Sequence, residues 1–455
     1  MRRMIVLCLV LLLSSQAIAK VKLPRILSSH MVLQRDQKVN IWGWADPGEK
    51  VTVTLAGKHK TVTADDSGDW LVVFPAQKAN KVGQEIKVKG NNEIILSNVL
   101  FGDVWLGSGQ SNMGFPLYKC HERDLWLGSG RWNDETIAAS EHANLRLYHV
   151  SSCESPEPLK DIRSYWAECS PKTTFHFSAV LYYFGRMVNA ETDVPMGLIS
   201  SAVAASPIEP WQVNGGKYNA MIAPLHNFKI KGFLWYQGES NIRPLAKSKV
   251  GMQYFDKQKL LIESWREKWG NDELPFYFVQ IAPHSGYKDG ALPLTWEAQC
   301  KTLTIPRTGM AVTTDTVHKI NDIHPRNKKI VGERLARWAL VFDYGKKMDY
   351  SGPLYKKHKV SGSKIVISFA HVGEGLVSRD GKPLNEFQIA GEDGKFVAAT
   401  AEIKGNTVVV SAESVKAPLN VRFGWHRRAN PNLMNKAGLP ASPFQTDNWQ
   451  GVTGK

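Results

Sequence analysis

Ser111, in a glycine-rich turn, is the first residue of this sequence that could act as a nucleophile. It lies in the segment Gly-Ser-Gly-Gln-Ser-Asn-Met, residues 107–113, which directly follows a predicted strand. The glycines let the backbone turn tightly, and neighbouring N–H groups can face a developing oxyanion. The segment differs from the G-x-S-x-G elbow, because Met113 occupies the second glycine position. By itself, Ser111 is also compatible with an ordinary turn.

A second segment places amide side chains after another predicted strand. Residues 235–241 read Trp-Tyr-Gln-Gly-Glu-Ser-Asn. The amides of Gln237 and Asn241 can donate to an oxyanion, and Gly238 permits close approach of the backbone. The alternative is a polar loop held together by hydrogen bonds of Glu239. This segment alone leaves both interpretations open.

A third segment supplies a base. Asp322 and His324 are two residues apart in the sequence Asn-Asp-Ile-His-Pro, just before a predicted helix. A carboxylate beside the imidazole would hold its tautomer and leave the other nitrogen free to take a proton. The alternative is a histidine that only caps local structure. Together the three segments offer a nucleophile, oxyanion donors and an oriented base, which favours nucleophilic hydrolysis.

Alternating strands and helices are predicted for residues 99–344, and this arrangement would bring the three segments together. The alternation is typical of a mostly parallel sheet covered by helices on both faces. Ligands of such sheets bind beyond the carboxyl ends of the strands. The predicted strands cover residues 103–106, 145–150, 197–203, 232–236, 276–281 and 309–313, and the clearest helices lie at residues 180–188, 255–269 and 328–340.

Regions rich in β-structure are predicted on both sides of this α/β unit. Residues 20–98 contain short alternating strands, such as 39–44 and 51–55, separated by turns. This pattern indicates an all-β unit of the sandwich type. Strands return in residues 345–455, most clearly at 364–369 and 407–410. The expected order along the chain is β, α/β, β.

Residues 1–19 are predicted to be a signal peptide. Arg2 and Arg3 precede an apolar run, and an Ala-Ile-Ala cleavage site precedes Lys20. The apolar run, residues 4–13, is about half as long as the roughly twenty residues of a membrane span. No later stretch of the sequence approaches that length. We therefore expect a periplasmic or secreted protein without a membrane span.

The composition is that of an ordinary globular protein. Of 455 residues, 43% are hydrophobic and 22% charged, which excludes disordered, collagen-like and multi-span membrane classes. The net charge is +15, but the basic residues are scattered and form no nucleic-acid-binding module, so we expect no nucleic-acid partner. Metal-ligand spacing such as C-x2-C is absent. In an oxidising compartment, three disulfide pairings are open to Cys120, Cys153, Cys169 and Cys300, and the sequence decides neither these nor the oligomeric state.

The three segments resemble the signature blocks of the sialate O-acetylesterase family, a branch of the SGNH (GDSL-like) serine hydrolases. Residues 109–113, 235–241 and 322–325 carry this resemblance, while residues 30–35, 41–45 and 435–444 resemble the terminal regions of the family. The resemblance covers essentially the whole mature chain. It implies a three-layer α/β/α catalytic domain at 99–344, flanked by β-rich regions at 20–98 and 345–455. The sequence is also similar to bacterial carbohydrate acetylesterases.

The resemblance implies a serine esterase that removes O-acetyl groups from carbohydrates, with no metal and no cofactor. Ser111 would attack the acetyl carbonyl, and His324 would accept its proton and then protonate the departing sugar hydroxyl. Asp322 is the implied orienting acid. SGNH enzymes more often show the spacing D-x-x-H, so Asp315 is the alternative. O-acetylated sialic acids are the first expected substrates, and acetylated xylan or other oligosaccharides are the alternative.

The resemblance also suggests how an oxyanion would be held. The backbone N–H of Ser111 is the expected first donor, and Gln237 is the first side-chain donor, with Asn241 as its competitor. Gln110 and Gly238 complete the predicted oxyanion and substrate contacts. Relatives usually carry a glycine pair where this chain has alanines at positions 204 and 205. Alanine would keep an inward N–H there if its φ stayed negative.

Two other classes of function remain open. The alanine pair at 204–205 is compatible with a carbohydrate-binding protein that has lost efficient catalysis. A glycoside hydrolase would need two carboxylates across a cleft, and Glu239 with Asp322 is the available pair. Trp211 is the expected platform on which a sugar ring would stack.

Overall fold

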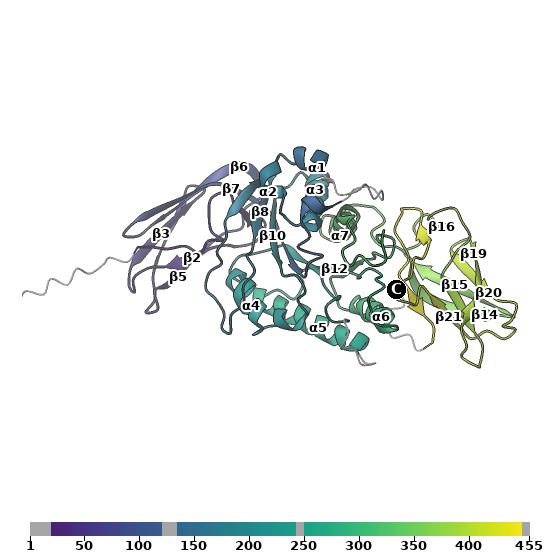
Figure 1. The fold of residues 1–455 in the computed structure, drawn as a ribbon. Coiled ribbons are helices and arrows are strands. Elements are labelled where there is room, and N and C mark those ends of the chain that lie inside the picture. Colours follow the sequence, from purple (N-terminus) through teal and green to yellow (C-terminus); the bar gives the residue numbers. More distant parts are fainter. Residues whose placement is uncertain (1–19, 121–133, 243–249, 448–455) are drawn as a thin grey trace, which may run out of the picture.

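The computed structural model describes residues 20–120, 134–242 and 250–447, so the expected signal peptide at residues 1–19 lies outside the described residues. Figure 1 shows three parts in a row, with an N-terminal β unit, a central α/β unit and a C-terminal β unit. This arrangement confirms the predicted α/β class with β-rich flanks.

The central unit is built on a mostly parallel sheet. Its strand order is β13-β12-β11-β7-β10-β8-β9, and only the pairing of β8 with β9 is antiparallel. The six predicted strands are confirmed. The bounds are β7 Glu93–Gly109, β8 His142–His149, β9 Trp166–Cys169, β10 Met196–Ala202, β11 Gly232–Tyr236, β12 Phe276–Val279 and β13 Thr308–Ala311.

Strand β7 lies at the centre of this sheet, between β10 and β11. The chain moves from β7 to one side of the sheet for β8 to β10 and then crosses to the other side for β11. Loops that follow the carboxyl ends of β7, β10 and β11 therefore meet at one edge. In open α/β sheets, ligands bind beyond the carboxyl ends of the strands, at the point where the strand order changes direction in this way.

Helices cover both faces of the sheet. Side chains alternate along each strand, so Trp105 packs in one apolar cluster with α3 and α7, whereas Leu106 packs in another with α5. Gly332 lets α7 approach α3 closely, because a Cβ at this position would lie 2.6 Å from the Val180 carbonyl oxygen. The helices are α1 Asp134–Ala138, α2 Pro171–Thr174, α3 Ala179–Thr192, α4 Gly216–Met221, α5 Val250–Trp269, α6 Ala291–Thr302 and α7 Lys328–Phe342, with short 3-10 turns η1 Leu117–Lys119, η2 Glu209–Trp211 and η3 Ala223–Leu225.

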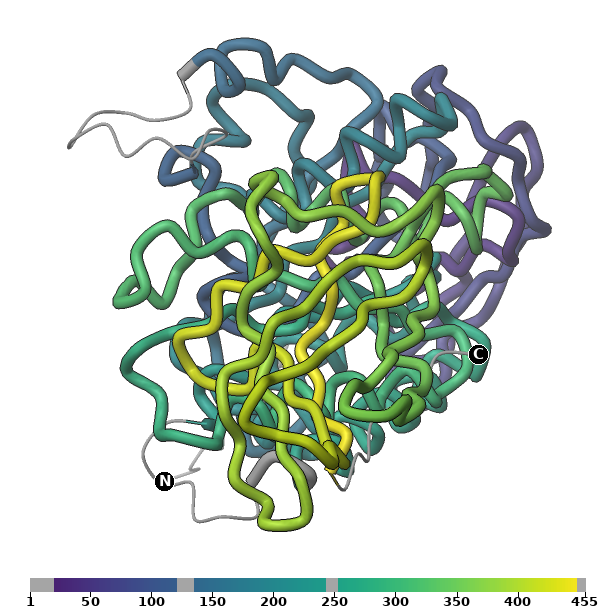
Figure 2. Tube along the Cα trace, turned by 90° about the vertical axis from the view of Figure 1, so that its right-hand side faces the viewer, coloured from purple at the N-terminus to yellow at the C-terminus, as the bar shows by residue number. Residues whose placement is uncertain are grey.

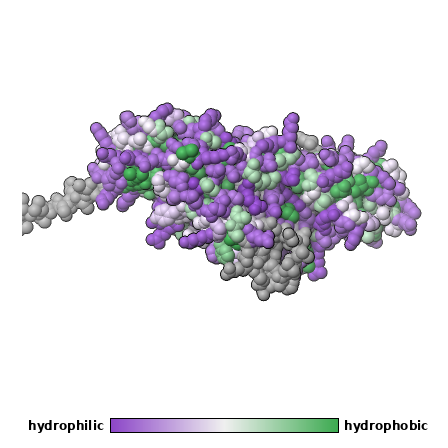
Figure 3. Space-filling view, turned by 90° about the horizontal axis from the view of Figure 1, so that it is seen from above, coloured by the Kyte–Doolittle hydropathy of each residue, from purple (hydrophilic) through white to green (hydrophobic). Residues whose placement is uncertain are grey.

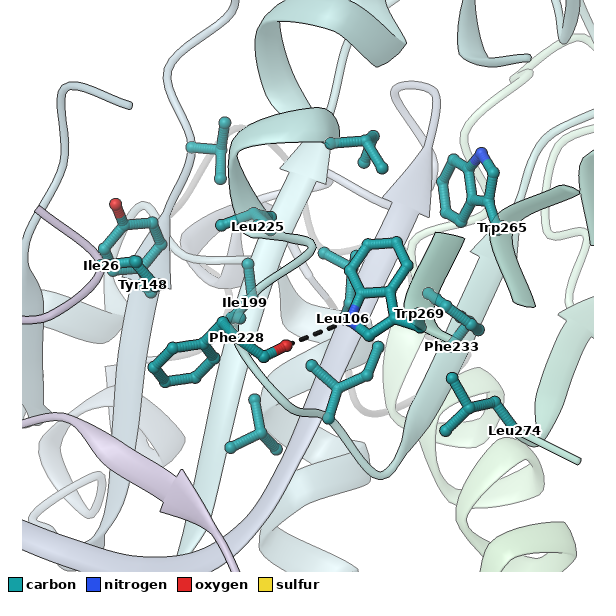
Figure 4. Close-up of a cluster of buried hydrophobic side chains, with 14 of the residues drawn as sticks. Ile26, Leu106, Tyr148, Ile199, Leu225, Phe228, Phe233, Trp265, Trp269 and Leu274 are labelled. Atoms are coloured by element: carbon teal, nitrogen blue, oxygen red, sulfur yellow. Dashed lines mark hydrogen bonds between the residues drawn. The ribbon is translucent and has the colours of Figure 1, made fainter. Parts of the chain in front are cut away.

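A large aromatic cluster connects the N-terminal unit with the central sheet. Figure 4 shows Leu106, Phe233 and Trp269 packed together, with Ile26 of the N-terminal unit at the margin of the same cluster. The Trp269 indole N–H donates to the Phe228 carbonyl at 3.0 Å. The two units therefore share one hydrophobic core instead of having separate ones.

The N-terminal unit is joined to the central sheet by a continuous strand. β7 pairs with β6 in its first half and with β10 and β11 in its second half, so it crosses position 98, the end predicted for the N-terminal unit. Gln34 and Arg35 also bind the carboxylate of the buried Asp103, at 2.8 and 2.9 Å. The remaining strands are β1 Val32–Gln34, β2 Val39–Trp44, β3 Lys50–Leu55, β4 Lys58–Thr63, β5 Asp69–Phe74 and β6 Asn80–Lys89.

The C-terminal unit consists of short antiparallel strands. Figure 2 shows it in yellow and light green in front of the rest of the molecule. The buried Asn435 holds it together, because its amide donates to the Ser351 and His371 carbonyls at 3.0 and 3.1 Å. The strands are β14 Leu354–Ser361, β15 Lys364–Ala370, β16 Leu376–Ser378, β17 Phe387–Ala390, β18 Val397–Ala398, β19 Thr400–Lys404, β20 Thr407–Ser411, β21 Asn420–Phe423, β22 Leu433–Asn435 and β23 Phe444–Gln445.

The surface is mainly hydrophilic on the face seen in Figure 3, with small, scattered apolar clusters. Among the described residues, no helix has both the length and the apolar character needed to cross a membrane. Cys120, Cys153, Cys169 and Cys300 are all free thiols. Burial raises the pKa of Cys169 and of Cys300 to about 12 each, so these two thiols carry little of the reactive thiolate.

Candidate active site

Ser111 lies in a tight turn immediately after β7. Gly109 ends the strand with φ of 131°, and a Cβ there would lie 2.2 Å from the Tyr236 carbonyl oxygen, so the turn requires glycine. The Gln110 carbonyl accepts hydrogen bonds from the N–H groups of Met113 and Gly114, at 2.9 and 3.1 Å. Within the described part of the chain, the Ser111 N–H has no acceptor. This N–H is therefore available to an oxyanion, as the sequence predicts.

His324 lies close to Ser111 in space, although it comes from a loop near the C-terminal end of the central unit's sequence. Its Nε2 lies 2.8 Å from Ser111 Oγ, although 213 positions separate the two residues. Asn327 is the N-cap residue of α7, just after this loop, and its side chain accepts a hydrogen bond from the Ile330 N–H at 3.3 Å. The Phe115 ring packs beside the imidazole, with ring centroids 5.8 Å apart. The structure thus brings together the predicted nucleophile and the predicted base.

Asp322 lies next to the histidine but also holds its loop. Its Oδ1 accepts the backbone N–H of His324 at 2.9 Å, and its Oδ2 lies 3.3 Å from Arg326 Nε. Asp315, the alternative acid, forms a bidentate ion pair with Arg334, with N–O distances of 2.7 and 2.6 Å. The geometry therefore ties Asp315 to α7 and leaves Asp322 as the acid beside the histidine.

We expect Asp322→Asn to lower the rate of ester hydrolysis by no more than about tenfold. Asparagine keeps an Oδ1 that can accept the His324 N–H, which is the contact that shapes the loop. An acid whose essential role is to hold the imidazole tautomer would instead cost about 10⁴-fold on amidation. Steady-state rates with a chromogenic acetate separate the two results, and a loss near 10⁴-fold would show that the negative charge itself is needed.

The predicted amide residues form a buried network that joins the two loops. Gln237 Nε2 donates to Gln110 Oε1, the Ser206 carbonyl and Asn241 Oδ1, at 3.1, 3.2 and 2.8 Å. Gln110 Oε1 also accepts the Ser240 N–H at 3.1 Å. The Gln237 amide is fully buried and already donates to protein oxygens, so in this arrangement it braces the loops and does not point at an oxyanion.

Gly238 has a backbone conformation that favours glycine. Its φ of 150° is in a region that side chains disfavour, and a Cβ there would lie 3.0 Å from Ile281 Cγ2. Asn241 is partly buried, and its amide donates to both carboxylate oxygens of Glu209 at 3.2 and 3.1 Å. Both residues therefore shape the loop that faces the Ser111 turn.

Sequence reasoning missed a second buried network, centred on Asn112. Lys328 Nζ donates to Asn112 Oδ1 at 2.6 Å, and Asn112 Nδ2 donates to Glu239 and to the Ile323 carbonyl, at 2.5 and 3.0 Å. Asn112 follows the predicted nucleophile, and Ile323 precedes the predicted base. The Asn112 side chain therefore connects the Ser111 turn with the His324 loop.

Lys328 completes this network from the first turn of α7. Its ammonium lies 5.1 Å from the ring centroids of both Phe115 and Tyr236, where cation–π attraction partly offsets the loss of water. Burial lowers the pKa of Lys328 to about 8, so most of the side chain remains protonated at neutral pH. The only signal in the sequence was a lysine at the start of a predicted helix, which normally indicates a solvated residue.

The loop after β10 contains the alanine pair. Ala205 has φ of 54°, so the condition of a negative φ, under which an alanine would keep its N–H directed inward, does not hold at this position. Ser206 follows it, buried, and its carbonyl accepts from Gln237 as described above. Glycine adopts a left-handed conformation freely, but an L-residue with a Cβ does so at a cost of about 1–2 kcal/mol.

We therefore expect Ala205→Gly to raise the free energy of unfolding by up to about 1 kcal/mol, as the strain at positive φ is relieved. Ala204→Gly is the matched control, because Ala204 does not have a positive φ. That variant should lower the free energy by about 0.4–1 kcal/mol through the added freedom of the unfolded chain. Thermal and urea unfolding of both variants would check this. Equal destabilisation by the two substitutions would contradict a strained Ala205.

The C-terminal unit is connected to the His324 loop through hydrogen bonds of His284. Arg427 pairs with Asp289 at 2.9 Å, and its backbone carbonyl accepts the His284 N–H at 2.9 Å. His284 Nε2 in turn lies 3.1 Å from the carbonyl oxygen of Asn321, next to Asp322. The C-terminal β region is therefore connected to the catalytic loop through residues 284–289.

Two interpretations from the sequence need correction. Trp211 is fully buried, and its indole N–H donates to Ser206 Oγ at 2.9 Å, so it belongs to the core and offers no face to a sugar. Glu239 is only 2% exposed and binds Asn112, so it is not a carboxylate presented across a cleft. The second finding removes the pair on which a glycoside hydrolase would depend. In the described ranges, no three His, Cys, Asp or Glu side chains are grouped so that they could hold a metal ion.

Comparisons with known proteins agree with this geometry. Residues 101–340 match the family model described as "Carbohydrate esterase, sialic acid-specific acetylesterase". The sialate O-acetylesterase of Homo sapiens is 27% identical over 489 residues, covering 92% of this chain and 91% of that protein. The proteins of that name from Pongo abelii and Mus musculus are also 27% identical. A crystal structure of a carbohydrate acetylesterase from Xanthomonas citri is 37% identical, with a TM-score of 0.88, and it covers 94% of this chain and 100% of that one.

Proposed function

The chain belongs to the carbohydrate esterase family of sialic acid-specific acetylesterases, and from this premise we propose that Ser111 and His324 are the residues with which it removes O-acetyl groups from sugars. The single observation that carries the assignment of the residues is the 2.8 Å contact between His324 Nε2 and Ser111 Oγ. This contact also argues against a carbohydrate-binding protein that has lost its catalytic residues.

The first step of the reaction follows from this contact. His324 Nε2 accepts the Ser111 hydroxyl proton while Oγ attacks the acetyl carbonyl carbon. The carbonyl oxygen becomes an oxyanion, and the Ser111 N–H, which has no acceptor in the described chain, can donate to it. The protonated imidazole then donates its proton to the sugar oxygen, the C–O bond breaks, and an acetyl-serine remains.

The second step reverses these roles with water. His324 removes a proton from a water molecule, whose oxygen attacks the acetyl carbon of the acyl-enzyme. Collapse of the second tetrahedral intermediate breaks the bond to Ser111 Oγ, and His324 returns the proton to the serine. The products are acetic acid, which loses its proton to the solvent to become acetate, and the free enzyme with Ser111 and His324 in their starting protonation states.

The sugar that carries the acetyl group is the finer part of the proposal. We place O-acetylated sialic acids first, because the names of the family model and of the curated mammalian relatives refer to sialic acid. Acetylated neutral oligosaccharides are the second candidate, because the structural relative from Xanthomonas citri is described as a carbohydrate acetylesterase without reference to sialic acid. The same residues would act on either sugar.

Acetate release from three substrates tests the proposal. The panel contains O-acetylated sialic acids, acetylated xylo-oligosaccharides and a chromogenic acetate, each with wild-type enzyme. We expect hydrolysis of the chromogenic acetate and of at least one sugar ester, with unchanged sugar-chain length. Faster hydrolysis of the xylo-oligosaccharides would identify acetylated xylan fragments, and not sialic acids, as the substrate. No acetate release from any of the three substrates would overturn the esterase assignment.

We also propose that the protein is exported to the periplasm or secreted. The support is the sequence pattern of residues 1–19, in which two arginines precede a short apolar run and a small-residue cleavage site. The mature chain would then begin at Lys20. The intact mass of the protein purified from an expressing cell tests this, and a chain that still begins at residue 1 would contradict it.

A further inference from the structure

A hollow of about 480 Å³ lies between the N-terminal β unit and the central unit. One wall is the paired strands β2 and β5, and the other consists of residues 159–160 and 223–227. Its volume is in the range of small-molecule sites, about 300–1,000 Å³. None of the residues assigned to catalysis lines this hollow.

The strand wall presents apolar side chains to the hollow. Trp42 pairs with Leu71 and Trp44 with Asp69 in the antiparallel register, so these four side chains share one face of the two strands. Trp44 is partly exposed and Leu71 is 45% exposed, and Leu159 opposite is 39% exposed. Large apolar side chains that remain exposed around one concave site mark a binding surface.

Polar groups with unused hydrogen-bonding capacity surround these apolar side chains. Asp65 uses Oδ1 to accept the N–H groups of Ser67 and Asp69, both at 2.9 Å, and within the described chain its Oδ2 has no partner. The side-chain amide of Asn227 and the Nδ1 atom of His226 likewise have no partner among the described residues. The hollow therefore offers both donors and acceptors.

The wall opposite the strands is firmly held in place. His226 Nε2 lies 3.0 Å from the Tyr218 hydroxyl, and its ring packs against Trp269 with centroids 4.8 Å apart. Figure 4 shows Leu225 and Phe228, which flank His226 and Asn227 in the sequence, within the buried aromatic cluster. Burial lowers the pKa of His226 to about 4, so the imidazole is neutral at pH 7. His226 and Asn227 are thus preorganised, and neither side chain adds a positive charge.

The charges in the hollow disfavour an anionic ligand. Asp69 is paired with Lys160 at 3.1 Å, which leaves Asp65 as an uncompensated carboxylate. An anionic ligand, such as a phosphate or a carboxylated sugar, would be repelled. Hydroxyl groups both donate and accept, and the C–H faces of a pyranose ring pack on indole and leucine side chains. We propose that this hollow is a second carbohydrate site, which binds a neutral saccharide.

The position of the hollow separates it from the catalytic centre. Residues 223–227 precede β11, and Lys231 donates to the Val104 carbonyl near the start of the parallel part of β7, whereas Ser111 follows the end of β7. The stretch of β7 from Asp103 to Gly109 spans about 20 Å. In Figure 1, β2 and β5 lie at the opposite end of the molecule from the C-terminal unit that supports the histidine loop. A saccharide in the hollow would therefore anchor a longer glycan without occupying the esterase site.

Calorimetric titration with unacetylated xylohexaose and cellohexaose tests the proposal on the full chain. We expect at least one of them to bind, and Trp44→Ala to weaken its association about tenfold. Leu71→Ala and Leu419→Ala form a matched pair, because both leucines are 45% exposed but only Leu71 lines the hollow. Leu71→Ala should weaken binding several-fold, and Leu419→Ala should leave it unchanged.

The remaining outcomes separate this site from the esterase. Trp44→Ala should hydrolyse a chromogenic acetate at the wild-type rate and melt at a similar temperature, because the ester does not need the hollow. No binding of either saccharide by the wild-type chain, or equal binding by wild type, Trp44→Ala and Leu71→Ala, would overturn the second site. Failure of wild type to hydrolyse the chromogenic acetate would overturn the esterase proposal while leaving the saccharide titration interpretable.

Discussion

Ser111→Ala should lower acetate release by about 10⁴- to 10⁶-fold, the scale of loss when a serine hydrolase loses its nucleophile. The geometry gives the physical reason. Ser111 Oγ is the atom that His324 Nε2 contacts at 2.8 Å, and no acyl intermediate can form without it. The initial rate with a chromogenic acetate measures this loss, because the assay needs no knowledge of the natural sugar.

The control for Ser111→Ala must separate lost chemistry from lost fold. The serine side chain is only partly buried, so its replacement should leave the thermal midpoint almost unchanged. A serine-directed phosphonate should label wild type at Ser111 and leave the alanine variant unlabelled. A variant that folds normally and still releases acetate at the wild-type rate would eliminate Ser111 as the nucleophile.

His324→Ala should lower the same rate by about 10⁴-fold, since the serine would lose its proton acceptor. Residues that act as one unit have effects that do not add. The double variant Ser111→Ala with His324→Ala should therefore be about as slow as either single variant. His318→Ala is the matched control, because His318 is an exposed histidine of the same segment between β13 and α7 and should keep full activity.

Two results would contradict the role of His324. A rate close to wild type would show that another group accepts the serine proton. A double variant slower than both single variants by the product of their separate effects would show that serine and histidine act independently. The substitutions Asp322→Asn and Ala205→Gly have smaller expected effects, because the first keeps the acceptor for the His324 N–H and the second changes only the backbone strain near this pair.

Much of the fold could be predicted because the local sequence contains it. The strands from Gly232–Tyr236 and Phe276–Val279 are short apolar runs, and the helix Ala179–Thr192 shows the spacing of one buried face. The alternation of such elements is sufficient for a parallel sheet covered by helices. That sheet in turn places Ser111 and His324 at the same edge, although 213 positions separate them.

The partners of individual polar groups could not be predicted in the same way. Asp315 has the right residue type and position for an orienting acid, yet its carboxylate binds Arg334. Gln237 is an amide at a strand end, yet its hydrogens are directed to three protein oxygens. These outcomes depend on residues that approach from other elements, and a motif does not contain them.

By itself, the sequence determined the order β, α/β, β, the edge of the sheet proposed as the active site, and the serine and histidine that meet there. Periodicity and turn residues are local properties, so a single chain reveals them. Only the tertiary structure decided that Trp211 is buried, that Lys328 and Asn112 join the Ser111 turn to the His324 loop, and that Trp44 lines the hollow beside the N-terminal β unit. Burial and hydrogen-bond partnership arise when distant segments pack together, and the type of a residue does not specify which segment will cover it.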